Sequence, residues 1–173
     1  MKKTLIIAIC CIAVLFTACK KPVEPTPEPI PEPETDYSSV YIGNYLGEFT
    51  LTLSGTMDTI PLTELSFPFD SIVMDITKGE AINEILASMT IDNEVYQTKG
   101  TTTAEKADLE TVHLNLNKPD FSIIGDIKLE AKPTEDNNLT LGGDFTGSGT
   151  IMFMGQSLPI QATGVVNGLL EKQ

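Results

Sequence analysis

Several residue types are missing or nearly missing from this chain of 173 residues. It has no tryptophan and no arginine, a single histidine, and no cysteine after Cys19. Without further cysteines, the part of the chain after Cys19 cannot form an internal disulfide or a thiolate metal site. With one histidine it cannot build a histidine-based metal cluster either. These absences exclude several classes of catalytic and metal-binding protein.

Basic residues are scarce as well. The chain carries 24 acidic residues against 11 lysines, for a formal net charge of −13 at pH 7. Nucleic acids and anionic lipid headgroups bind basic patches, and arginine is the residue best suited to bidentate phosphate contacts. We therefore expect no nucleic-acid partner. Because an acidic domain repels carboxylates and phosphates, a small ligand is expected to be apolar or a neutral glycan.

The first 19 residues have the pattern of a bacterial lipoprotein signal. Two lysines follow the initiator methionine, residues 5–16 are apolar, and Ala18 directly precedes Cys19. The apolar run is too short for a spanning helix, which needs ~20 residues. We predict a signal peptide at 1–18, cleavage between Ala18 and Cys19, and acylation of Cys19 with palmitate-like chains. The alternative is an ordinary secretory signal with plain cleavage.

A tether follows the cysteine. Residues 20–34 are mostly proline and glutamate, which cannot build a core because proline lacks an amide donor and the glutamates repel one another. We assign 19–35 to the lipidated cysteine and an extended tether. The predicted partner is therefore a membrane, held through a covalent lipid anchor. The expected location is the cell envelope, as an outer-membrane lipoprotein on the periplasmic face or the cell surface.

Residues 36–173 are predicted to form one all-β domain. Phe49 and Leu51 share one face of an alternating segment, and Val112 and Leu114 share one face of another. Such alternation indicates antiparallel sheet with one solvated side. Short strands joined by hairpin-length connections favour an up-and-down barrel of about eight strands. The predicted strands, some of which merge, are 45–53, 58–67, 70–77, 87–93, 94–99, 109–117, 121–131, 139–146, 147–154 and 157–166.

One segment departs from this pattern. Over 79–89, apolar residues recur at spacings of three and four, at Ile82, Ile85, Leu86 and Met89. This spacing predicts the one short helix of the domain. A buried strand is the alternative, because the segment is brief.

The last third of the chain is rich in glycine. Gly143, Gly147 and Gly149 share the parity of Phe145 and Ile151, so we expect all five to face inward. Glycines on a packed face indicate strong coiling of the strands. They also leave space inside a barrel, which is where a ligand would bind.

These features resemble the calycin-like, or lipocalin-like, domain lipoproteins of Gram-negative gut bacteria. The resemblance rests on the lipobox with its acidic tether, on the domain opening YIGNYLGEFTLTLSG at 41–55, and on the glycine-rich segment 145–168. It covers most of 41–168. It implies an eight-stranded barrel with an interior ligand site and no common ligand. The Gly-x-Trp element of better-known lipocalins is absent, because the chain has no tryptophan.

The same bacteria modify proteins by O-glycosylation at Asp-Ser/Thr-aliphatic tripeptides. The chain contains two matches, Asp58-Thr59-Ile60 and Asp70-Ser71-Ile72. The resemblance therefore makes Thr59 and Ser71 candidate modification sites, although about one such match is expected by chance.

Candidate catalytic groups are few. His113 lies on the polar face of its predicted strand, where a surface role is expected, and no triad is available to it. The oxygen-rich residues 135–138 lack the spacing of a calcium-binding loop and fit a hairpin turn better. We therefore predict that the protein is not an enzyme and has no cofactor and no metal site.

Two function classes remain in front of a distant third, an envelope enzyme. A binding module would keep an unfilled barrel interior for an apolar or neutral ligand. A structural or interaction lipoprotein would fill the interior and act through its outer surface. In either case we expect a monomer. The candidate pocket residues are Phe49, Leu51, Val112, Leu114, Gly143, Phe145, Gly147, Gly149, Ile151 and Phe153.

Overall fold

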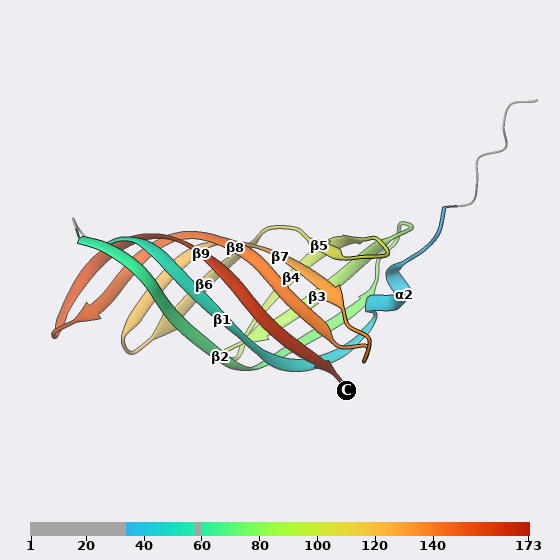
Figure 1. The fold of residues 1–173 in the computed structure, drawn as a ribbon, viewed down its shortest axis with the longest axis horizontal. Helices are drawn as coiled ribbons and strands as arrows, with labels where there is room; N and C mark the ends of the chain where they lie inside the picture. The colour runs from blue at the N-terminus through green and yellow to red at the C-terminus, as the bar shows by residue number, and fades with distance from the viewer. Residues whose placement is uncertain (1–33, 58–59) are drawn as a thin grey trace, which may run out of the picture. The chain divides into compact units, whose positions relative to one another are not determined.

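The computed structural model describes residues 34–57 and 60–173. The chain divides after Pro33, and the second unit, Glu34–Gln173, is compact. The predicted signal peptide, its cleavage site and Cys19 lie outside the described residues. The second unit, called the domain below, is almost entirely β-strand (Figure 1). The predicted all-β antiparallel fold class is therefore confirmed.

The described residues of the domain form nine strands and one short helix. They are α2 Ser38–Tyr41, β1 Gly43–Met57, β2 Ile60–Lys78, β3 Glu84–Ile91, β4 Glu94–Thr102, β5 Ala107–Leu109, β6 Val112–Lys118, β7 Phe121–Pro133, β8 Leu139–Phe153 and β9 Gln156–Lys172.

Eight of the strands hydrogen-bond in a closed ring, called the barrel below. Around the ring the order is β5, β4, β3, β2, β1, β9, β8 and β7, and a pairing between β5 and β7 closes it. β6 is the ninth strand and pairs with β7. All the pairings are antiparallel, and most join strands that follow each other in the chain. This is the up-and-down order that hairpin-length connections predict.

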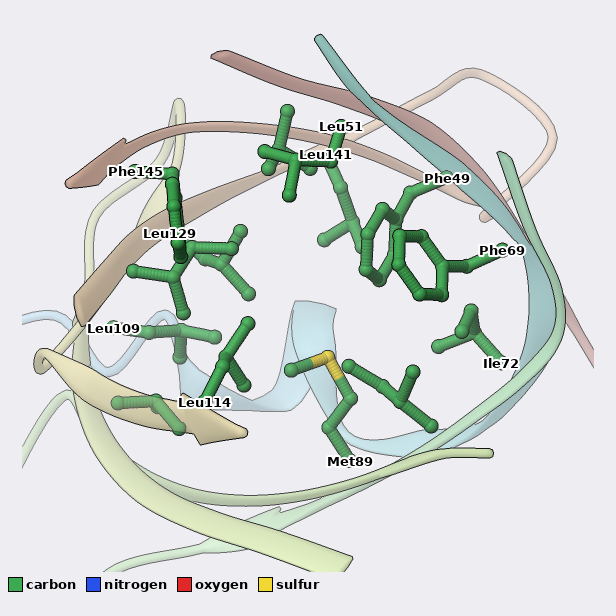
Figure 2. Close-up of a cluster of buried hydrophobic side chains, with 14 of the residues drawn as sticks. Phe49, Leu51, Phe69, Ile72, Met89, Leu109, Leu114, Leu129, Leu141 and Phe145 are labelled. Carbon is green, nitrogen blue, oxygen red and sulfur yellow. The ribbon is translucent and has the colours of Figure 1, made fainter. Parts of the chain in front are cut away.

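The alternating side chains place one face of each strand inside the barrel. Phe49, Leu114 and Phe145 are buried as predicted, whereas His113 on the opposite parity is exposed. Figure 2 shows side chains from several strands pointing toward the interior. Buried hydrophobic residues from eight strands form one cluster, and β4 adds the half-buried Tyr96. Burial of this cluster is the main force that holds the ring closed.

The predicted helix over 79–89 is wrong. Residues 79–83 form a bend and turn, and β3 follows. Ile85, Ala87 and Met89 are buried with a period of two, while Ile82 and Leu86 are exposed. The one short helix of the domain is α2, which lies before the first strand.

Several predicted strand boundaries also change. The segment 70–77 and the described part of 58–67, from Ile60 on, belong to one strand, β2. The segments 139–146 and 147–153 likewise belong to one strand, β8. The segment 109–117 instead divides between β5 and β6.

β2 stays continuous because it absorbs two irregularities in its pairing with β1. The register shifts between Gly47 and Phe49, and again between Leu53 and Gly55. At these bulges Ser71 has φ 59° and Glu64 has φ 55°. β3 pairs only with the last part of β2, from Val73 onward. The bulges and two prolines in the earlier part of β2 protect that free edge from pairing with other chains.

The two ends of the barrel differ. At the end called proximal, α2 lies across the barrel with Tyr41 fully buried. The Tyr41 hydroxyl donates to the carbonyl oxygen of Thr103 at 3.0 Å, and the Tyr45 hydroxyl donates to that of Tyr41 at 2.9 Å. Lys78 forms an ion pair with Asp36 beside the helix. These contacts close the proximal end.

The opposite end, called distal, carries the turn between β8 and β9 (Figure 1). Phe153 pairs with Gln156, so the turn has two central residues, Met154 and Gly155, with φ 50° and 79°. Positive φ at both positions identifies a type I′ turn, whose twist matches that of the flanking strands. Among the described residues, no helix has the length and apolar character needed to cross a membrane.

Candidate functional site

Five of the ten predicted pocket residues line the interior of the barrel but leave little space there. Phe49, Leu51, Leu114 and Phe145 are each at most 2% exposed, and Val112 is 6% exposed. A cavity large enough for water would leave accessible surface on the side chains that line it. The structure therefore places these five residues in a packed core.

The inward glycines do not provide the expected room. A Cβ atom added to Gly147 would lie 2.5 Å from Cζ of Phe145 and 2.6 Å from the carbonyl oxygen of Ile124. At Gly149 the nearest atom would be the Ser122 carbonyl oxygen, at 2.0 Å. The glycines thus let neighbouring strands coil closely past one another, and the Phe145 ring covers Gly147.

The three remaining pocket candidates, Gly143, Ile151 and Phe153, differ in burial. A Cβ atom at Gly143 would lie 2.4 Å from the Lys128 carbonyl oxygen, so this position is also closed. Ile151 is partly buried against the core. Phe153 is 49% exposed, because the β8–β9 turn extends beyond the last pairing of β7 with β8, at Phe121 and Ile151. Phe153 therefore belongs to the surface.

A seam runs between β4 and β6, which the described pairings do not join. The Tyr96 hydroxyl bridges it, donating to Glu94 Oε2 at 2.7 Å and lying 3.2 Å from the carbonyl oxygen of Asn115. Thr98 Oγ1 donates to the carbonyl oxygen of Glu110, in the connection between β5 and β6, at 3.0 Å. Burial, and then the hydrogen bond to Glu94, raise the pKa of Tyr96 to about 12. Side chains therefore connect β4 with β6, which share no backbone ladder in the described pairings.

His113 has one polar partner, and it is on the neighbouring strand. Its Nδ1 lies 2.9 Å from Oδ1 of Asp126, and both side chains are more than 60% exposed. The pair therefore lies on the open surface of the described domain. Residues 135–138 lie in the turn between β7 and β8, where the Thr134 amide donates to the Asn138 carbonyl at 2.9 Å. The predicted hairpin turn is therefore confirmed.

One charged hollow on the outer surface contains ion-paired side chains. It measures about 450 Å³ and lies over Gly142 and Gly143. Lys106 contacts Asp108 at 2.8 Å and Glu130 at 3.2 Å. Hydrogen bonds from Lys132 and Lys106 lower the pKa of Glu130. Within the described part of the chain, no group of three or more His, Cys, Asp or Glu residues is placed to hold a metal ion.

One stretch of the outer surface, formed by β8 after Asp144 and by β9 before Glu171, carries no charged side chain. No charged residue occurs between Asp144 and Glu171. A hollow of about 600 Å³ lies over this region and is lined mainly by Thr56, Ser148, Thr150 and Gln161. Sequence reasoning missed this uncharged stretch of the surface, although the run is visible in the sequence.

Of the two candidate O-glycosylation sites, the structure describes one. Thr59 lies outside the described residues. Ser71 is exposed at the bulge of β2 that lies opposite Gly47 and Phe49. Its hydroxyl is accessible, as a modified residue requires.

No protein-family model matches the chain, and no curated protein matches it significantly.

Proposed function

We propose that this chain is a membrane-anchored lipoprotein of the bacterial cell envelope that acts through its outer surface. The lipid on Cys19 holds it at the membrane. The barrel is a filled scaffold with no enzymatic activity. The calycin-like resemblance supports the barrel and the anchor, but its interior ligand site is not part of the proposal.

The packed interior is the observation that carries this choice between the two function classes. Leu51, Ile72, Ile85 and Leu114 come from four different strands, and each has an exposed fraction of 0%. The aromatic rings of Phe49 and Phe69 stack near the same core, with centroids 4.9 Å apart. A binding module of the lipocalin type needs open interior volume. Packing of this kind favours action through the outer surface.

The anchor is tested by replacing the cysteine. The full chain is expressed in a Gram-negative host grown with an alkyne analogue of palmitate. We expect the wild-type chain to carry the label and to partition into a detergent phase, because two or three acyl chains bind bilayers almost irreversibly. Cys19→Ala should abolish both properties. A Cys19→Ala chain that still carries the label would contradict the proposal.

The other two cysteines provide the matched control. Cys10 and Cys11 lie within the predicted signal peptide. Cys10→Ala and Cys11→Ala should leave labelling and detergent partition unchanged, because cleavage removes both positions. An unlabelled wild-type chain beside a labelled, known lipoprotein in the same cells would also count against lipidation.

A further inference from the structure

An apolar knob forms the end of the β8–β9 turn. Met152, Phe153 and Met154, called the distal tip below, are 45%, 49% and 89% exposed. The turn protrudes beyond the last pairing of β8 with β7 and of β9 with β1. Three consecutive large apolar side chains therefore project from the end of the barrel that α2 does not cover.

The backbone conformation at position 154 does not favour methionine. Met154 has φ 50° at the first central position of a type I′ turn, where asparagine, aspartate or glycine is the favoured residue. Few other residues adopt positive φ, and an exposed apolar side chain gains nothing there from packing. An apolar group thus stands where both the turn and the solvent favour a polar one.

The parts of β8 and β9 that flank the distal tip carry no charge. The run without charge from 145 to 170 includes the whole turn and both flanking strand segments. Insertion limited to Phe153 and Met154 would therefore dehydrate no charged group of β8 or β9, and such dehydration is the main cost of membrane entry. The nearest charged residue is at the base of the tip, where the Met152 amide donates to the carbonyl oxygen of Asp120 at 2.8 Å. Between Glu34 and Gln173 no other uncharged run is as long.

The size of the tip favours a bilayer over a second protein. Three partly exposed side chains offer at most a few hundred Å², whereas a stable protein interface buries about 800 Å² per partner. A bilayer requires no minimum interface and no matching shape. Once the chain is anchored, insertion becomes an intramolecular step, so even weak affinity gives substantial occupancy.

The chain is long enough for the tip to reach the membrane that holds the anchor. The residues from Cys19 to Glu34 can span at most about 50 Å. β8 has 15 residues, which corresponds to ~50 Å of strand and to about 40 Å along the axis of a barrel with tilted strands. The two lengths are similar, so the covalent connection allows the distal end to contact that same bilayer.

We propose that the distal tip inserts into the interfacial region of the bilayer to which the chain is anchored. The barrel then has two attachments, a covalent lipid before the domain and an apolar knob at its far end. This inference rests on the proposed lipid anchor for its function, and its test separates the two.

The absence of tryptophan gives a direct probe. Phe153→Trp keeps an aromatic side chain at the tip and provides the only tryptophan in the chain. In phosphatidylcholine vesicles that hold the lipidated chain, we expect a blue-shifted emission that brominated lipids quench. Ile82→Trp is the matched control, since Ile82 is 54% exposed in the turn before β3, next to the proximal contact of Tyr37 with Asn83. Its emission should remain that of water-exposed tryptophan.

A second substitution separates insertion from folding. Met154→Asn places a favoured residue at positive φ, so stability should be kept or raised. In the Phe153→Trp background it should lower the ratio of inserted to free tip about tenfold, because an apolar side chain of this size is removed from the interface. Equal quenching with and without Met154→Asn would contradict the proposal.

A second preparation tests the insertion of the tip without the covalent lipid on Cys19. A hexahistidine tag in place of Cys19 recruits the chain to nickel-chelating phosphatidylcholine vesicles. Unquenched, unshifted Phe153→Trp emission on these vesicles overturns the insertion and leaves a protein partner for the tip. If the natural chain does not float with vesicles but the emission of the tagged chain is quenched, the lipid anchor is contradicted and the insertion of the tip is supported.

Discussion

At the scale of single residues, Tyr96 shows how a side chain substitutes for backbone pairing. Its hydroxyl contacts Glu94 on its own strand and the backbone of Asn115 across the seam. The sequence predicted a strand over 94–99, but it contained no signal that this tyrosine would bridge to β6. Such contacts depend on which strands are neighbours in space, and the alternation of residues along one strand carries no such information.

Tyr96 also predicts a pH dependence. Its pKa is about 12 in the fold against 10.0 in a model peptide. The unfolded chain therefore releases this proton first, and the stabilisation from Tyr96 is lost as pH rises from about 10 to about 12. The difference in unfolding free energy between wild type and Tyr96→Phe, measured by urea denaturation, should narrow over that range. A difference that stays constant from pH 9 to pH 12 would contradict the burial and hydrogen bonding assigned to this hydroxyl.

At the scale of elements, the sequence predicted most strands but misassigned 79–89. Ile85 and Met89 are four residues apart, a spacing that fits one face of a helix and one face of a strand equally well. The exposed Ile82 and Leu86 completed a helical pattern by coincidence. The turn before β3 is instead held by the Glu84 carboxylate, which accepts hydrogen bonds from the amides of Glu80 and Ala81 at 2.8 and 3.0 Å.

The sequence correctly indicated that the glycines of β8 face inward. The expectation that they leave space inside the barrel was wrong. Their parity follows from the alternation of residues, so the sequence indicates that they face inward. Whether an inward glycine leaves space depends on how closely the next strand approaches. That distance is set by the coiling of the whole sheet, which one strand does not determine.

Two glycines of β8 give a test of this close approach. Gly147→Ala should lower the unfolding free energy by about 1–3 kcal/mol, because its Cβ atom would meet the backbone of β7. Gly142→Ala is the control, since the nearest atom to its Cβ would be a Glu130 side-chain oxygen at 3.5 Å. That change should leave stability unchanged or raise it by up to about 1 kcal/mol. Urea denaturation would contradict the account if the two variants were equally stable.

At the scale of the whole molecule, the described domain is closed at one end and carries the apolar distal tip at the other. α2 covers the proximal end, and the distal tip projects from the opposite one. The sequence supports an anchor through Cys19 and a barrel, and both follow from patterns local to the chain. The choice between an open and a filled interior depends on how side chains from eight strands pack together, and it becomes visible only in the structure.

The most direct test of the filled barrel is whether a small apolar probe enters it. Phe145→Ala removes a ring from the core and should cost about 3–5 kcal/mol while creating a cavity that binds benzene or xenon. Leu129→Ala offers a second cavity at a cost of about 2–5 kcal/mol if the first variant unfolds. By NMR titration, we predict that benzene shifts the interior resonances of a cavity variant and leaves those of the wild-type barrel unchanged. Saturable benzene binding inside the wild-type barrel would contradict the filled scaffold and restore the interior ligand site.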